Sequence, residues 1–254
     1  MRNTLLYTTL LLLAFAACKK DSEPASGQNG TTSTVQDDFV KPNHFLASDK
    51  YDKLIIEIQY VKGYEPTAAA LNSLKAFLEQ RINKPQGIEF TEKEVPSPGR
   101  SSYSLTDVAA NEAASRTQHA NGKTLTAYIF FADGPYSANT ANSEVLGFAY
   151  GTSSMVIFEK TIQQSSGGLS QPSTQALETL VLEHEFGHTL GLVNRGTPLQ
   201  SAHVDAQHAN HCSNQNCLMY YQAETSDVIG NMLGNGVSTL DAACIADLQA
   251  NGGK

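Results

Sequence analysis

Basic residues are scarce in this chain of 254 residues, which has 17 Lys and Arg against 25 Asp and Glu and a formal net charge of −8. Phosphate backbones are bound mainly through Lys and Arg, so this acidic composition argues against a nucleic acid partner. Long apolar runs are also missing, because the stretch from Leu5 to Ala17 covers only 13 residues and no later run is long enough. A helix needs about 20 apolar residues to cross a bilayer, so the sequence predicts no membrane span.

Residues 1–17 have the pattern of an export signal. Arg2 gives a positive start, and the short apolar run that follows ends in Phe15-Ala16-Ala17-Cys18. Small residues before a cysteine resemble a bacterial lipoprotein signal, in which Cys18 becomes the lipidated first residue. We therefore expect an exported protein that is held through Cys18 on a bacterial membrane, at the outer membrane or cell surface. The alternative is an ordinary signal peptide followed by an unrelated cysteine.

The segment that follows, residues 18–48, is expected to be a flexible tether. Residues 19–38 are rich in Ser, Thr, Gly, Asn, Gln and Asp and offer almost nothing to bury. Such a composition cannot offset the entropy cost of ordering the chain. Residues 49–254 remain, and this length suits a single domain, which we expect to be a monomer.

Alternating apolar residues and helical spacing divide that domain into strands and helices. Their order, strand-helix-strand-helix-strand-strand-helix, predicts an α/β layer with a mixed sheet. The segment 145–158, which breaks near residues 151–153, is expected at the edge of the sheet, where an extended peptide can pair with free backbone groups. The expected strands are 54–61, 88–95, 124–132 and the two parts of 145–158, and the expected helices are 66–82, 106–118, a helix carrying residues 184–188, and 239–248.

The rest of the chain is organised around residues 184–194, which read HEFGHTLGLVN. On a helix, positions i and i+4 lie on one face, so His184 and His188 can present two imidazoles to one metal ion. Glu185 can reach a water molecule on that metal and act as the general base. Apolar residues surround the motif, which is typical of a buried helix, where polar groups without a function are costly. Gly191 suits the end of this helix, because a positive φ lets the chain turn.

The order H-E-x-x-H-x-x-G resembles the metzincin clan of zinc peptidases. The resemblance implies a zincin-like α/β (α+β) single domain, in which a mixed twisted sheet places an edge strand over the active-site helix and a small C-terminal subdomain follows. It also implies one catalytic Zn²⁺ ion and a peptide or protein substrate that binds along the edge strand.

The third metal ligand departs from the clan's pattern. Metzincins place a histidine three residues after the glycine, and this chain has Asn194 there. The segment 211–219, however, resembles archaemetzincins, in which the third histidine is followed by Cys, four residues, Cys, one residue and Met. We therefore expect His211 to be the third ligand and residues 195–210 to loop out. His203, His208 and Asn194 remain as alternatives, and we expect His203 and His208 to be exposed loop residues.

The same resemblance assigns two further residues and the cysteines. Met219 is expected to pack beneath the metal histidines, and Tyr221 is a weaker candidate for stabilising the transition state, in competition with Tyr220. Archaemetzincins hold a second zinc with four cysteines ending in C-x-x-C, which is missing here. In an exported protein we instead expect Cys212 and Cys217 to form a disulfide, with Cys244 buried and free.

Together these features predict a zinc-dependent peptidase with His184, His188 and His211 as ligands and Glu185 as the general base. The alternative is a non-catalytic surface-binding lipoprotein that keeps the zincin scaffold. Asn194 favours the alternative, and the intact Glu185 disfavours it. Whether the enzyme cleaves inside a chain or at its N-terminus stays open.

Overall fold

A five-stranded sheet forms the centre of the computed structural model, which describes residues 40–254 apart from 142, 231 and 233–235. The strand order is β2-β1-β3-β5-β4. β1 is parallel to β2 and β3, β3 is parallel to β5, and β4 runs antiparallel to β5. The predicted mixed sheet is therefore confirmed. Its strands are β1 (Lys53–Val61), β2 (Ile88–Val95), β3 (Thr124–Phe131), β4 (Gly147–Tyr150) and β5 (Ser154–Ile157).

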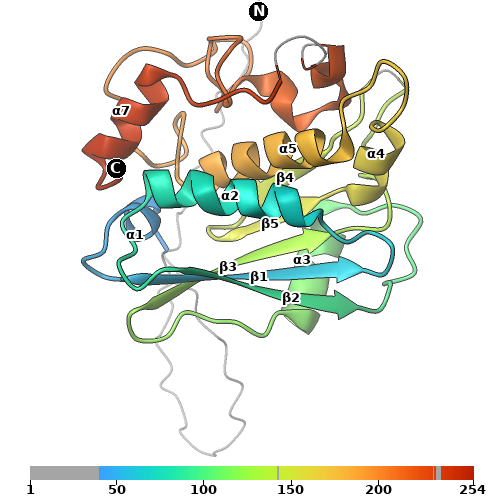
Figure 1. The fold of residues 1–254 in the computed structure, drawn as a ribbon, viewed down its shortest axis with the longest axis horizontal. Helices are drawn as coiled ribbons and strands as arrows, with labels where there is room; N and C mark the ends of the chain where they lie inside the picture. The colour runs from blue at the N-terminus through green and yellow to red at the C-terminus, as the bar shows by residue number, and fades with distance from the viewer. Residues whose placement is uncertain (1–39, 142, 231, 233–235) are drawn as a thin grey trace, which may run out of the picture. The chain divides into compact units, whose positions relative to one another are not determined.

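Helices cover both faces of this sheet (Figure 1). The long helices α2 and α5 pack side by side on one face, and α3 packs against β3 on the other. The order of strands and long helices agrees with the prediction, while two short helices, α1 and α4, were not predicted. The helices are α1 (Pro42–Leu46), α2 (Ala68–Arg81), α3 (Leu105–Ser115), α4 (Glu159–Gln164), α5 (Thr174–Thr189), the 3-10 turns η1 (Tyr221–Glu224) and η2 (Ser226–Val228), and α7 (Ala242–Ala250).

β1 shows why the sequence alternates as it does. Its apolar residues Leu54, Ile56 and Ile58 are fully buried in the core that the sheet shares with α2 and α5. Glu57, on the opposite face, is also buried, and its carboxylate accepts backbone hydrogen bonds from Thr117 at 2.8 Å and Gln118 at 2.6 Å. β1 thus carries apolar contacts on one face and a satisfied polar network on the other.

The folded domain begins earlier than the predicted boundary at residue 49. Phe45 and Leu46 of α1 are fully buried, and the ring of Phe45 packs edge-on against Phe186 of α5, with 6.1 Å between ring centroids. Residues 40–48 therefore belong to the fold and not to the tether. The prediction failed because one short helical turn gives no periodic signal. The predicted signal peptide and residues 18–39 lie outside the described residues.

α5 is the buried helix that the sequence predicts. The Ser173 side chain caps its start by accepting a hydrogen bond from the Ala176 amide, and every residue from 177 to 189 is buried. The helix ends at Leu190, and Gly191 has the expected positive φ of 81°. A Cβ at that position would lie 2.4 Å from Pro42 Cγ, so glycine also allows α1 to pack close to the turn.

β4 lies at the sheet edge beside α5, as predicted, whereas β5 lies inside the sheet between β3 and β4. The two strands are joined through Gly151, which has a φ of 59°. The C-terminal part of the chain, from residue 195, includes the 3-10 turns η1 and η2 and the helix α7. Among all the residues that the structure describes, no helix is both long and apolar enough to cross a membrane.

Candidate metal centre

The two histidines of α5 meet at one point inside the molecule. His184 is fully buried and His188 is nearly so, and their Nε2 atoms are 3.1 Å apart. The Leu218 carbonyl accepts a hydrogen bond from His184 Nδ1 at 2.7 Å, which assigns the proton to Nδ1 and leaves a lone pair on Nε2. One helical turn of spacing thus places two imidazole nitrogens where a single ion could bind both.

His211 approaches the same point from a distant part of the chain. Its ring stacks on His184 at 5.4 Å between centroids and lies edge-on to His188 at 5.1 Å. The Ala209 carbonyl accepts a hydrogen bond from His211 Nδ1 at 3.0 Å, so Nε2 again carries the free lone pair. Residues 195–210 leave the turn after Gly191 and return, which brings the three predicted ligands together.

A fourth residue at this point, Glu224, was missed from the sequence. It lies at the end of η1, and its Oε1 atom is 2.9 Å from His211 Nε2 without the alignment of a hydrogen bond. Single ligand atoms of His184, His188, His211 and Glu224 all lie within 4.8 Å of one another. The available signal was a carboxylate five residues after Met219, but spacing alone does not show that a 3-10 turn aims it at the histidines.

Glu185 links the helix to the edge of the sheet. Its Oε2 atom accepts a hydrogen bond of 2.7 Å from the backbone amide of Ala149 in β4. Its Oε1 atom is buried and has no hydrogen-bond partner among the described residues. Burial, followed by the negative charge of Glu224, raises the pKa of Glu185 well above its ordinary value. A bound cation would offset both effects by favouring the carboxylate.

The electrostatics of the imidazoles suit metal binding. Burial lowers the pKa of His184 to about 4. Burial, followed by the neighbouring His184, lowers the pKa of His188 well below its ordinary value. Both rings are therefore neutral at physiological pH, and a neutral imidazole is the form that binds metal.

Met219 forms the floor predicted beneath the histidines. It is fully buried, and a Cβ built on Gly187 would lie 2.3 Å from its sulfur. Gly187 lies between His184 and His188 in α5, so the thioether packs directly against the turn that carries both ligands. Only glycine leaves room for this contact.

The donor set of this centre fits zinc. Three neutral imidazoles with one open position are a common catalytic zinc site, and tetrahedral coordination predicts about 3.3 Å between ligand nitrogens, close to the 3.1 Å between His184 and His188. The free His211 Nε2 faces the Glu224 carboxylate without a hydrogen bond, an arrangement that a cation between them would satisfy. We refer to His184, His188, His211 and Glu224 as the histidine centre.

Three other predicted candidates lie elsewhere. Asn194 is exposed, with a φ of 69°, in the turn that leaves α5. His208 Nδ1 donates a 2.8 Å hydrogen bond to Asp205 Oδ2, and the His208 ring stacks on Tyr221 with 3.5 Å between centroids. The same stacking occupies the Tyr221 ring, whose hydroxyl accepts a 3.4 Å hydrogen bond from Gln222.

His203 and the cysteines correct two expectations. His203 is buried, not exposed, and its Nε2 atom donates a 2.8 Å hydrogen bond to the buried Asp247. In the part of the chain that the structure describes, Cys212, Cys217 and Cys244 are all free and buried, so the predicted Cys212–Cys217 disulfide was wrong. The reason is that the Cys212 thiol contacts His203 and the Cys217 thiol contacts Cys244 of α7. Local spacing in the sequence does not reveal these long-range contacts.

Two hollows flank β4 next to the histidine centre. The larger has a volume of about 470 Å³ and is lined by Tyr136, Val145 and Phe148, with Glu224 at its border. The smaller, of about 120 Å³, includes His188 and Arg195. Ala149, whose amide donates the hydrogen bond to Glu185, lines both hollows, so the edge strand β4 borders two recesses, one lined by His188 and the other by Glu224.

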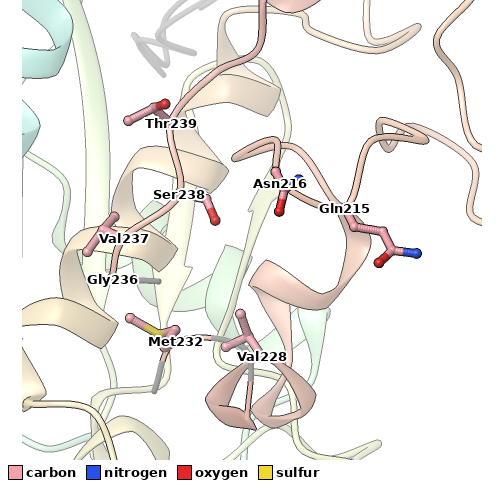
Figure 2. A pocket seen from close by; sticks show the side chains of 8 residues that line it. All are labelled: Gln215, Asn216, Val228, Met232, Gly236, Val237, Ser238 and Thr239. Atoms are coloured by element: carbon pink, nitrogen blue, oxygen red, sulfur yellow. The ribbon is translucent and has the colours of Figure 1, made fainter. Parts of the chain in front are cut away.

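A further hollow is lined by residues 215–216 and by residues between 228 and 239. Figure 2 shows this space of about 400 Å³, with Asn216 and Ser238 across from Val228 and Met232. None of its described lining residues carries an acid, an imidazole or a thiol. We therefore place the chemistry at the histidine centre.

Comparisons with known proteins give a likeness of fold. No profile of a known protein family matches the sequence, and no curated protein matches it. Among solved structures, the chain is similar to archaemetzincin (amzA) from Methanopyrus kandleri, with a TM-score of 0.51 and 14% identity. The match covers 80% of this chain and 96% of the archaemetzincin chain, so the likeness extends over the whole of that fold.

Proposed function

We propose that this protein is a zinc-dependent peptidase that hydrolyses peptide bonds. The observation that carries the proposal is the convergence of three buried imidazoles, together with a buried carboxylate oxygen, Glu185 Oε1, that follows His184 in the chain and has no hydrogen-bond partner among the described residues. The H-E-x-x-H-x-x-G motif and the archaemetzincin-like fold support the same reaction class.

His184, His188 and His211 would hold the ion through their Nε2 atoms. The Leu218 and Ala209 carbonyls fix the first and third rings through Nδ1, which keeps the lone pairs pointed at one spot. When bound, zinc supplies a Lewis acid that polarises the scissile carbonyl and makes water more acidic.

Glu185 performs the proton transfers. Its Oε1 atom accepts a proton from the attacking water and then delivers it to the leaving amine. Its Oε2 atom is held by the Ala149 amide, which fixes the carboxylate against the strand along which a substrate would lie. The distance from base to substrate is therefore set by the contact between α5 and β4.

The substrate is a peptide in extended conformation, which adds to the edge of β4. The outward backbone groups of Ala149 are already engaged, since Arg195 donates a 3.3 Å hydrogen bond to its carbonyl and Glu185 accepts from its amide. A peptide that pairs with this carbonyl must displace the exposed Arg195 side chain. The aromatic hollow lined by Tyr136 and Phe148 favours an apolar side chain next to the scissile bond.

Tyr221 stays a prediction as a transition-state stabiliser. Its ring stacks on His208, and any contact with a substrate would require the ring to leave that stack. We assign it no step in the reaction.

The alternative of a non-catalytic binding protein was based on Asn194. Asn194 is exposed and the ring of His211 contacts those of His184 and His188, which supports a ligand set of three histidines without Asn194. That observation therefore ceases to favour the alternative.

We also propose that the protein is exported and anchored to the outer membrane or cell surface through a lipid on Cys18, as a monomer. The proposed export and lipid anchor depend on residues 1–39, which lie outside the described part of the chain. Cys18→Ser should release the protein from the membrane fraction. Continued membrane association with incorporated fatty acid would contradict the anchor.

Digestion of a mixed peptide library tests the proposed reaction. The zinc-loaded protein should cleave peptides, a chelator should abolish cleavage, and Glu185→Gln should lower the rate by about 100-fold or more because the general base is lost. Glu183→Gln is the matched control, since Glu183 is on the same helix but faces Arg81 and not the histidines. Unchanged cleavage by Glu185→Gln, or none by the zinc-loaded protein, would refute the proposal.

A further inference from the structure

Four side chains from three parts of the fold form a second cluster. His203 comes from the segment that loops out after α5, Cys212 and Cys217 flank the turn that follows, and Cys244 comes from α7. The three sulfur atoms and the imidazole are buried, with His203 the most exposed at 7%. We refer to these four residues as the thiol cluster.

The spacing of the thiol cluster is that of a tetrahedral metal site. His203 Nδ1 lies 3.5 Å from Cys212 Sγ and 3.9 Å from Cys244 Sγ, and Cys217 Sγ lies 3.6 Å from Cys244 Sγ. Tetrahedral zinc with ordinary bond lengths places ligand sulfurs about 3.8 Å apart and a sulfur and a nitrogen about 3.6 Å apart. The observed separations match these edges and are far too long for disulfide bonds.

Asp247 holds His203 in the orientation that a metal requires. The Asp247 side chain is fully buried, and its Oδ2 atom accepts the His203 Nε2 hydrogen at 2.8 Å, while its Oδ1 atom accepts the Gln200 amide at 2.6 Å. The proton on Nε2 leaves the Nδ1 lone pair facing the thiols. A carboxylate that accepts from the far nitrogen of a histidine ligand is the usual support of a metal-binding imidazole.

The surroundings of Cys217 favour a negative charge on its sulfur. Its sulfur accepts backbone hydrogen bonds of 3.4 Å from Met219 and from Asp241. Two amides aimed at one sulfur favour the thiolate, which is the form of cysteine that binds metal.

The carboxylate of Asp241 is a competing ligand, because one of its oxygens and the ligand atoms of His203, Cys212 and Cys244 all lie within 4.8 Å of one another. Its oxygens already accept hydrogen bonds: Oδ1 accepts from the Cys244 amide at 2.9 Å and caps α7, and Oδ2 accepts from Asn214 at 3.0 Å and from the Cys212 thiol at 3.4 Å. Thiolate is also the softer ligand and is preferred by zinc over a carboxylate in closed sites. Cys217 is therefore the fourth member of the site, and Asp241 supports it from outside.

We propose that His203, Cys212, Cys217 and Cys244 bind a second zinc ion in a closed structural site, with Asp247 as the positioning residue for His203. This site lacks the C-x-x-C of archaemetzincins and takes a histidine from the looped-out segment and a cysteine from α7 in its place. This second site is inferred without reliance on the proposed peptidase activity.

The second ion would stabilise the histidine centre through the chain. Cys212 directly follows His211, and Cys217 directly precedes Leu218, whose carbonyl orients His184. One ion bound to Cys212, Cys217 and Cys244 would thus fix the segment 211–218 against α7. That segment supplies His211 and the Leu218 carbonyl that orients His184.

Metal content of the purified protein tests the proposal. After dialysis the wild-type chain should contain two zinc ions, and Cys244→Ala and His188→Ala should each contain one. His208→Ala is the matched control, because His208 is in the same looped-out segment but outside both clusters, and it should contain two. A wild-type chain with one ion, or Cys244→Ala with two, would overturn the proposal.

Two measurements on the wild-type chain remain decisive if Cys244→Ala does not fold. Cobalt substitution should give a sulfur-to-cobalt charge-transfer band that persists in His188→Ala. Alkylation followed by peptide mass spectrometry should find Cys212, Cys217 and Cys244 protected with metal and modified after chelation. Absence of the band, or a Cys217–Cys244 disulfide in the metal-loaded protein, would overturn the second site while leaving the peptidase proposal intact.

Discussion

The sulfur of Met219 lies so close to Gly187 that a single added carbon on that glycine would be 2.3 Å from it. This contact joins the helix that carries His184 and His188 to the turn that follows His211. The contact between Met219 and Gly187 therefore helps to fix His211 relative to His184 and His188.

Gly187→Ala should force Met219 away and destabilise the fold by about 1–3 kcal/mol, as expected for overpacking in a close-packed core. Thermal unfolding measures the change. Gly230→Ala is the control, because a Cβ there meets nothing within 4 Å, and its unfolding temperature should barely change. Equal unfolding temperatures for Gly187→Ala and the wild-type chain would show that the contact is loose.

Glu224→Gln should weaken zinc binding at the histidine centre by about tenfold, in the range found when a charged partner of a metal site is removed. The carboxylate lies 2.9 Å from His211 Nε2 and supplies the negative charge closest to that ligand. Competition with a chromophoric chelator gives the affinity. Asp227→Asn, an exposed neighbour in η2, serves as the control and should leave it unchanged. Equal zinc affinities in Glu224→Gln and wild type would remove Glu224 from the site.

The stability of the fold should decrease as the pH rises above neutrality. Glu159 is fully buried, and burial, followed by the negative charge of Glu178, raises its pKa from 4.5 to about 9. Between these two values the folded chain keeps a proton that the unfolded chain has lost, so folding becomes less favourable by up to about 1.4 kcal/mol per pH unit.

Glu159→Gln should therefore raise the unfolding temperature at pH 8 and flatten its dependence on pH. Glu92→Gln, on the exposed part of β2, is the control and should keep the wild-type slope. A Glu159→Gln protein with the same slope as wild type would contradict the assigned protonation.

Phe45→Ala should destabilise the domain by about 3–5 kcal/mol, because a fully buried ring is removed from its contact with Phe186. Leu169→Ala, at a fully exposed position, should stay within about 0.5 kcal/mol. Denaturant unfolding compares them. If Phe45→Ala unfolds like wild type, α1 contributes nothing to the domain and the boundary near residue 49 is restored.

Helical spacing and turn residues in the sequence were enough to predict the part of the site that lies on α5 and the turn after it. His184, Glu185 and His188 are set by helical spacing, and the turn at Gly191 by the need for a positive φ. The succession of strands and helices along the chain could be predicted because alternation and turn residues repeat in the sequence, whereas the order of the strands within the sheet was not predicted. His211 was assigned from a short motif and not from geometry, since 16 residues separate it from the turn.

The remainder depends on contacts between distant segments. Glu224 and His203 have no local spacing that links them to the histidines or the thiols, and Cys244 meets Cys217 only when α7 packs. The disulfide prediction failed for the same reason: the distance between Cys212 and Cys217 in the sequence says nothing about Cys244.

The central claim is that His184, His188 and His211 hold one zinc ion beside Glu185. An anomalous difference map from crystals of the zinc-loaded protein tests it most directly. The account predicts a peak about 2.0–2.1 Å from Nε2 of all three histidines. A peak that places the ion within bonding distance of His203 or Asn194 in place of His211, with the His211 ring turned to solvent, would contradict this claim.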